Sequence, residues 1–237
     1  MKRRKIMNSA SEMLSFNEGK FTCSMVLILS IFTLFLALIS IEGTNVQKNR
    51  DEINSLLIKS KIIPDVLPTS APEALKVSYG DKVVDFGNKL TKTETWNPPT
   101  YVDWTADQKS YYCLIMADPD FPDANCKSGQ WQHWKVGNIP GTNISKGQSM
   151  SDYIGVQAKN GTGVHRYVFV VYKQLNGKMK FDEFHLINFP ADDLRANFST
   201  KEFAEQYNLG DPVAVNYFLS EWDDYPEFRG DIEYPNF

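Results

Sequence analysis

Short runs of alternating apolar and polar residues, separated by glycine and proline, dominate the chain after residue 74. Such alternation is typical of β-strands. Two runs, residues 111–116 and 165–173, are almost continuously apolar and rich in β-branched and aromatic residues, which predicts central strands buried on both faces. The predicted strands are residues 75–79, 82–86, 111–116, 133–139, 165–173 and 212–222.

Two segments have the apolar spacing of helices instead. Residues 52–63 form one predicted helix, which Pro64 ends because proline has no N–H to donate. Residues 198–210 form the second predicted helix. Its start signals are Ser199 as N-cap, Glu202 as the partner in a capping box, and a contact of Phe198 with Phe203. The order of elements predicts a mainly β domain with a few small peripheral helices, and not repeated βαβ units.

A longer apolar segment precedes this region. Residues 21–41 carry no charge, and as a helix they would span about 30 Å, the thickness of a bilayer core. The segment is therefore either a signal anchor or a long signal peptide. The basic leader, residues 1–20, favours an anchor, whereas a small-residue site at Gly43 is compatible with cleavage. In both cases the globular part is exported.

The composition fits one globular domain. With 237 residues, 42% of them apolar, the chain can bury one sizeable core. The net charge is -4 and the leader holds five of the basic residues, so the remainder is more acidic. This balance excludes a typical nucleic-acid surface. The predicted organisation is a basic leader (1–20), an apolar segment (21–41), a stalk or linker (42–51) and a globular domain (52–237).

Export agrees with two further features of the domain. Three Asn-x-Ser/Thr glycosylation sequons follow the apolar segment, at Asn143, Asn160 and Asn197. Cys113 and Cys126 are the two cysteines outside that segment, and in an oxidising compartment they are candidates for a disulfide. The alternative is that Cys113 is a buried strand residue and Cys126 a free loop thiol.

The densest group of reactive side chains is ADPDFPDANCKSGQWQHW, residues 117–134. The spacing of its aspartates and of His133 matches neither a zinc nor a calcium motif, so no metal is predicted. The sequence also lacks a serine nucleophile elbow, and Cys126 has no adjacent base. A binding pocket is the remaining interpretation, with proline-stiffened aspartates and two histidines at strand ends. Arg166 either adds a positive charge there or pairs with an acid.

Four motifs, ADPDFP, WQHWKVGNIPG, GTGVHRYVFVVYKQ and SEWDDY, follow one another in the order and spacing of the phosphatidylethanolamine-binding protein (PEBP) family. The chain resembles this family from about residue 52 to residue 225. The resemblance implies an antiparallel β-sandwich with small flanking helices. It also implies a compact anion pocket that takes phosphate or a phospholipid head group such as phosphoethanolamine, without a cofactor.

The resemblance assigns residues to this pocket. The ligand-binding candidates are Asp118, Asp120, Pro122, Trp131, His133, Gly163, His165 and Tyr167, with Pro119 and Gly161 beside them. The chain departs from the family after residue 225, where Pro226 and Gly230 disfavour the C-terminal helix that covers the pocket in some members. What covers the pocket here stays open.

These observations predict a secreted or membrane-anchored binding protein for phosphorylated head groups or other small anions, and not an enzyme. Its membrane contact, if any, would run through residues 21–41. The alternative is an extracellular protein-interaction module such as a protease inhibitor. A hydrolase acting on phosphoester or acyl substrates rests only on the closeness of histidine and aspartate in the sequence.

Overall fold

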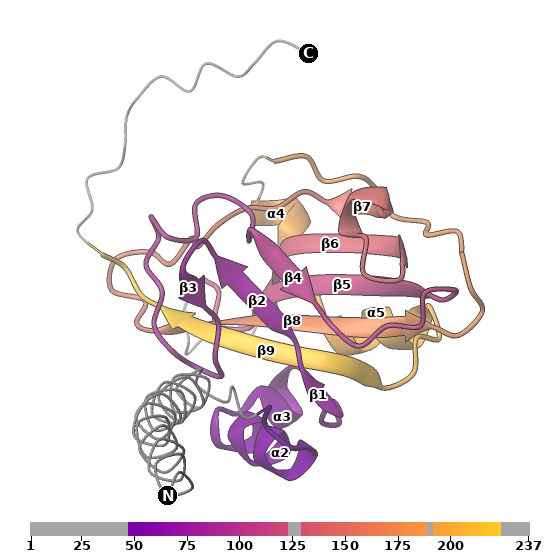
Figure 1. Ribbon diagram of the computed structural model, residues 1–237. Coiled ribbons are helices and arrows are strands. Elements are labelled where there is room, and N and C mark those ends of the chain that lie inside the picture. The colour runs from indigo at the N-terminus through magenta and orange to yellow at the C-terminus, as the bar shows by residue number, and fades with distance from the viewer. Residues whose placement is uncertain (1–46, 123–128, 189–191, 224–237) are drawn as a thin grey trace, which may run out of the picture. The chain divides into compact units, whose positions relative to one another are not determined.

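Two β-sheets and a set of short helices make up the fold (Figure 1). The computed structural model describes residues 47–122, 129–188 and 192–223. The described residues from Lys48 onward belong to one compact unit. The predicted class, an antiparallel β-sandwich with a few small peripheral helices, is confirmed.

The larger sheet has six strands in the order β1-β9-β8-β5-β6-β7. In it β1 is parallel to β9 and the other pairs are antiparallel. Its strands are β1 (Glu73–Ala74), β5 (Tyr111–Asp118), β6 (Trp131–Pro140), β7 (Gln148–Ser151), β8 (His165–Gln174) and β9 (Pro212–Ser220). The smaller, antiparallel sheet consists of β3 (Lys82–Val83), β2 (Lys76–Tyr79) and β4 (Tyr101–Asp103).

The larger sheet is buried on both faces, as the continuous apolar runs predict. Along β8, Tyr167, Phe169 and Val171 pack in the core shared with the smaller sheet. Their neighbours Val168 and Val170 pack in a second core on the other face. Because side chains alternate along a strand, one apolar run supplies both cores.

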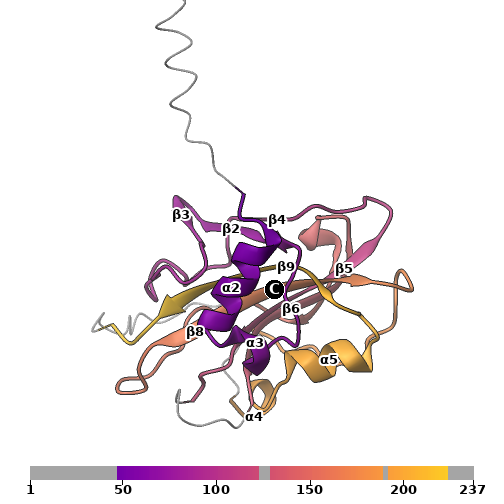
Figure 2. The same ribbon diagram turned by 90° about the horizontal axis from the view of Figure 1, so that it is seen from below.

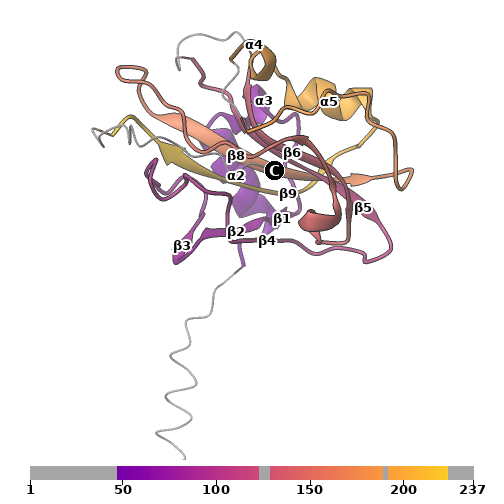
Figure 3. The ribbon, with the colours of Figure 1, turned by 90° about the horizontal axis from the view of Figure 1, so that it is seen from above.

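Helices cover the second core (Figures 2 and 3). Ile53 and Leu57 of α2, with Phe203 of α5, bury their side chains there. Figure 3 shows α5 and the smaller sheet on opposite sides of the larger sheet. The helical segments are α2 (Arg50–Lys59), α3 (Ile62–Asp65), α4 (Asp192–Arg195), α5 (Thr200–Gln206) and the 3₁₀ turn η1 (Ile144–Lys146).

The first predicted helix is wrong at both ends. A capping box between Asn49 and Glu52 starts α2 at Arg50, inside the predicted linker. The helix ends at Lys59 because Lys61 adopts a left-handed conformation with φ of 57°. Pro64 lies within the separate α3. The spacing of apolar residues therefore predicted one helix where the structure has two, separated by the left-handed residue Lys61.

The second predicted helix is confirmed but shorter. Ser199 caps α5 by accepting a 3.2 Å hydrogen bond from the Glu202 N–H. The rings of Phe198 and Phe203 lie 5.9 Å apart, which confirms the predicted contact. Strands β1, β4 and β7 were not predicted, because two to four residues are too few to show alternation.

Cys113 is fully buried and has a free thiol in the described structure, which favours the alternative of a buried strand residue, and the disulfide with Cys126 stays a prediction. The Cys113 side chain lies in the core under the helices, five residues before the end of β5 at Asp118. Burial raises the pKa of the Cys113 thiol to about 12. Cys126 lies outside the described residues.

Features of the predicted export remain predictions. No helix in the described part of the chain is long and apolar enough to cross a membrane, and residues 1–41 lie outside it. Asn143, Asn160 and Asn197 are all exposed, so the fold leaves the three sequons accessible.

Candidate functional site

The end of β5 and the starts of β6 and β8 lie at the same end of the larger sheet and bring together the predicted polar residues. Asp118 ends β5 directly opposite Trp131, which begins β6, and His165 begins the neighbouring β8. Asp118, Trp131, His133, His165 and Tyr167 form what we name the imidazole cluster. All five are fully buried.

A β-bulge places His133 in this cluster. Met116 pairs with Trp134 and Ala117 with Gln132, so His133 is an extra residue on β6. Bulges turn a side chain away from the regular alternation of a strand. The His133 ring consequently lies 4.5 Å from the Trp131 ring and 5.0 Å from the Tyr167 ring, measured between centroids.

Asp118 and His165 form a buried pair on the face of the smaller sheet. Nδ1 of His165 lies 2.7 Å from Oδ2 of Asp118. The other carboxylate oxygen accepts a 2.7 Å hydrogen bond from the Asp120 N–H. Burial raises the pKa of Asp118, and the hydrogen bond from His165 opposes that rise.

Thr162 fixes the protonation of this pair. Its hydroxyl lies 2.8 Å from the Lys159 carbonyl oxygen, which can only accept, and 2.8 Å from Nε2 of His165. The single hydroxyl hydrogen goes to Lys159, so Nε2 of His165 must carry a hydrogen and donate it to Thr162. One further proton lies between Nδ1 and Asp118. The pair therefore has no net charge, whichever partner holds that proton.

His133 has the opposite arrangement. Its Nδ1 lies 2.8 Å from the carbonyl oxygen of Ile154 and must donate to it. Burial lowers the pKa of His133 to about 3, so the ring is neutral at neutral pH. Its Nε2 thus carries a lone pair, and this buried atom has no hydrogen-bond partner among the described residues.

The neutral ring predicts a pH dependence of stability. Folding lowers the pKa of His133 from 6.5 to about 3. The contribution of neutral His133 to the free energy of unfolding is therefore fully present above about pH 6.5, and it is lost as the pH falls toward the pKa of the folded state. Within this window the free energy of unfolding should fall by up to about 1.4 kcal/mol per pH unit through His133. Urea unfolding of wild type and His133→Asn at several pH values measures this, since asparagine does not titrate. Equal pH slopes for the two proteins would contradict it.

Three more buried polar atoms near the cluster lack partners in the described part of the chain: Nε1 of Trp131, Oη of Tyr167 and Oγ of Ser220. Ser220 lies directly across from His165 on β9. Burial raises the pKa of Tyr167 well above its ordinary value, so its hydroxyl keeps its hydrogen. Tyr167 also stacks on Phe218, with ring centroids 5.0 Å apart.

Asp120 and Arg166 pair on the other face of the sheet. The Arg166 side chain donates to both oxygens of Asp120, at 2.8 and 2.7 Å, and its Nη1 donates to the Ser60 carbonyl oxygen. Asp65 also lies 3.4 Å from this guanidinium. Of the two alternatives for Arg166, pairing with an acid is the one observed. Both carboxylate oxygens of Asp120 accept hydrogen bonds from the Arg166 guanidinium.

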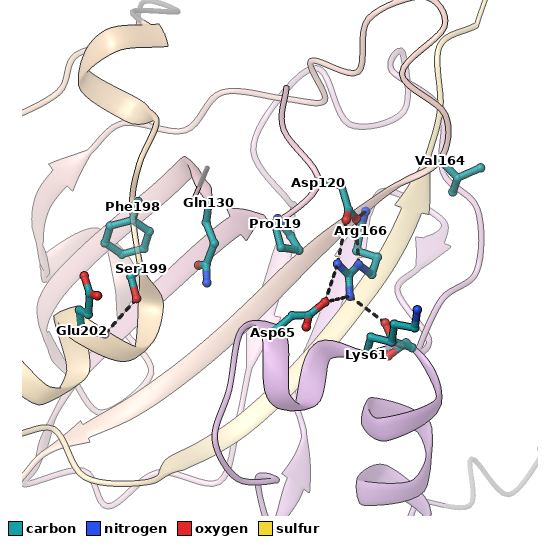
Figure 4. A pocket seen from close by; sticks show the side chains of 12 residues that line it. Lys61, Asp65, Pro119, Asp120, Gln130, Val164, Arg166, Phe198, Ser199 and Glu202 are labelled. Atoms are coloured by element: carbon teal, nitrogen blue, oxygen red, sulfur yellow. Dashed lines mark hydrogen bonds and ion pairs between the residues drawn. The ribbon is translucent and has the colours of Figure 1, made fainter. Parts of the chain in front are cut away.

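A groove of about 540 Å³ lies beside this pair (Figure 4). Pro119, Asp120 and Arg166 line one side of it, and Phe198, Ser199 and Glu202 line the opposite side. Asp120 and Pro119, which the sequence placed in and beside the anion pocket, therefore border a groove on the helix-covered face. The imidazole cluster faces the smaller sheet instead.

The remaining predicted residues have mainly backbone roles in the structure. Pro122 is exposed and follows a cis peptide bond, whereas its neighbour Phe121 packs against Trp131 at 5.6 Å. Gly161 and Gly163 both have φ of 83°, which by itself favours glycine. They flank Thr162 and so set its contact with His165.

Arg195 is a site residue that sequence reasoning missed. It is fully buried, and its guanidinium lies 5.4 Å from the Trp131 ring centroid. It donates hydrogen bonds to the carbonyl oxygens of Gln132, Leu186 and Ile187 and to Oγ of Ser151. Its polar sequence surroundings give no sign of burial. The Arg195 guanidinium, fixed by these hydrogen bonds, therefore packs against the Trp131 ring and holds it in position.

Comparison with known proteins identifies the family. A sequence model described as "Phosphatidylethanolamine-binding protein" matches residues 78–218. A Drosophila melanogaster protein named "Putative odorant-binding protein A5" is 34% identical over 83% of this chain and 92% of its own length. The "26 kDa secreted antigen" of Toxocara canis is 41% identical over 69% of this chain and 62% of its own length.

Solved structures agree on the fold. The phosphatidylethanolamine-binding protein from Plasmodium vivax has a TM-score of 0.59 and 25% identity, covering 71% of this chain and 97% of that chain. A carboxypeptidase Y inhibitor, solved with its cognate proteinase, has a TM-score of 0.63 and 21% identity, covering 77% and 99%. The family match spans more than half of the chain, so this chain belongs to the phosphatidylethanolamine-binding protein family.

Proposed function

We propose that the imidazole cluster binds the polar head of a small ligand, and that phosphorylated head groups such as phosphoethanolamine are its ligand class. The carrying observation is a group of buried polar atoms on Trp131, His133, Tyr167 and Ser220 that have no partner in the described part of the chain. Buried polar atoms in native proteins are nearly always hydrogen-bonded. Several orphans on neighbouring side chains favour a ligand that supplies the missing bonds.

The chemistry of the cluster suits an oxygen-rich head group. The Trp131 N–H and the hydroxyls of Tyr167 and Ser220 can donate to ligand oxygens. The buried Asp118 and His165 pair, satisfied within the protein, fixes the wall from which Tyr167 projects. The proposed roles of the cluster are thus recognition and orientation, and they include no nucleophile or proton transfer.

The names of the relatives support binding and export. One is named as an odorant-binding protein, one as a secreted antigen, and a structural neighbour as a phosphatidylethanolamine-binding protein. None of these names describes an enzyme. The carboxypeptidase Y inhibitor shares the fold at 21% identity, which does not carry protease inhibition to this chain. The interaction-module hypothesis stays a prediction.

Calorimetric titration of the purified full chain with phosphoethanolamine tests the proposal. His133→Asn keeps an N–H where Nδ1 donates to Ile154 but removes Nε2, so it should weaken binding by about tenfold or more. The control is His185→Asn, since His185 is exposed and pairs with Asp152 outside the cluster. Equal binding by all three proteins, or binding by none, would overturn the assignment of the cluster.

A further inference from the structure

A second cavity lies at the opposite end of β8 from the imidazole cluster. It has a volume of about 170 Å³ and lies between α5 and the start of β9, with Tyr172 of β8 and Pro68 among its lining residues. Seven residues of β8 separate Tyr172 from His165, a span of about 23 Å, and side chains an odd number of positions apart point to opposite faces. The cavity is therefore separate from the imidazole cluster.

Tyr172 brings an unpaired hydroxyl to this cavity. The residue is only 1% exposed and packs in the core under the helices. Its Oη has no hydrogen-bond partner in the described part of the chain. Burial raises the pKa of Tyr172 above its ordinary value, so the hydroxyl keeps its hydrogen and can both donate and accept. Because buried polar atoms are nearly always hydrogen-bonded, this hydroxyl indicates a partner that enters the cavity.

The other lining residues favour a ligand without charge. Ala204 and Pro212 line the cavity beside Tyr172 and are apolar. Lys201 and Glu205 lie one turn apart on α5 with exposed side chains, and their charged groups are 3.8 Å apart, so the opposite charges offset each other. A charged ligand would lose hydration here without gaining a buried counter-charge.

We propose that this cavity binds a small neutral molecule about the size of phenol, with an apolar body and one hydroxyl or carbonyl oxygen that pairs with the Tyr172 hydroxyl. An engineered apolar cavity of about 150 Å³ is large enough to hold benzene, so a volume of about 170 Å³ accommodates a single ring. This second ligand site is independent of head-group binding by the imidazole cluster.

Three compounds that share one ring test the proposal with the purified wild-type full chain. In equilibrium dialysis, phenol should bind about tenfold more tightly than toluene, because it adds one hydrogen bond to the same apolar contact. Benzoate should bind about tenfold more weakly than phenol, because its charge has to be desolvated. If phenol does not bind, or binds no better than toluene, the Tyr172 hydroxyl pairs with water only and the proposal is wrong.

Tyr172→Phe removes the hydroxyl and leaves the ring. The variant should bind phenol about tenfold more weakly than the wild type and toluene equally well. Its urea midpoint without ligand should equal or exceed that of the wild type, because a buried hydroxyl without a partner is lost. Phenol affinity equal to that of the wild type would overturn the proposal.

Tyr112→Phe is the matched control. The Tyr112 hydroxyl accepts a 2.9 Å hydrogen bond from the Asp107 N–H, and its side chain packs in the core shared with the smaller sheet, so its loss should leave phenol affinity unchanged. Tyr172→Phe should also bind phosphoethanolamine as the wild type does. A loss of phosphoethanolamine binding in that variant would contradict the separation of the two sites, whereas failure of phenol to bind leaves the proposed function intact.

Discussion

Asp118→Ala should lower the free energy of unfolding by about 3–5 kcal/mol, the usual penalty for removing one partner of a buried ionic or hydrogen-bonded pair. The substitution leaves Nδ1 of His165 and the Asp120 N–H without their acceptor, and both lie where water does not reach. The total free energy of unfolding of a domain is about 5–15 kcal/mol, so this loss is a large fraction of it. Urea unfolding followed by tryptophan fluorescence measures the loss.

Asp118→Asn is the matched control. Its side-chain carbonyl can still accept from the Asp120 N–H, and its amide can donate to Nδ1 of His165, whose Nε2 keeps its hydrogen for Thr162. The expected loss is about 1 kcal/mol or less, because every hydrogen bond is retained. If asparagine and alanine destabilised the protein equally, the hydrogen-bond assignment for this pair would be wrong.

The second large effect is expected for Arg195→Met. Methionine fills much of the same space but removes the donor to the carbonyl oxygens of Gln132 and Ile187, whereas the Leu186 oxygen still accepts from the Asp152 N–H. Leaving the buried Gln132 oxygen without this donor costs about 1–3 kcal/mol and the partly buried Ile187 oxygen adds less, so a loss of about 2 kcal/mol or more is expected. Urea unfolding again provides the measurement. A variant as stable as the wild type would contradict the role assigned to this guanidinium.

Arg195→Lys separates charge from geometry. Lysine keeps the positive charge but cannot reach several carbonyl oxygens with a planar fork, so its stability should lie between those of wild type and Arg195→Met. In the proposed site Arg195 would act on the ligand through Trp131, so it is a positioning residue. Its substitutions should change the fluorescence of Trp131 in the folded protein and weaken phosphoethanolamine binding together. Weak binding with unchanged fluorescence would refute this route.

The sequence predicted the sheet well where the strands are long. Residues 111–116 and 165–173 lie within β5 and β8, because a strand buried on both faces must be apolar at every position. The short strands β1 and β7 left no such pattern. The break at Lys61 was missed since a left-handed lysine has no sequence signal comparable to glycine.

For the site, the sequence predicted which residues lie close together better than it predicted how their side chains are oriented. The family motifs brought Asp118, His133, His165 and Tyr167 together, and the fold places all four in one cluster. The motifs did not reveal that a bulge turns His133 inward, because a bulge depends on the register of two strands. Nor did they show which nitrogen of each histidine is used, since backbone carbonyl oxygens and Thr162 decide this.

The two ion pairs at the strand ends have an evolutionary consequence. Asp118 pairs with His165 on one face of the sheet, and two residues along, Asp120 pairs with Arg166 on the other. Replacing either member of such a pair alone leaves its buried or partly buried partner uncompensated. Among relatives, positions 118 and 165 should therefore change together, as should 120 and 166. A lineage that abandons ligand binding could lose the first pair while retaining the second, because Arg166 also bonds Ser60 and Asp65 of the helical segment that covers the sheet.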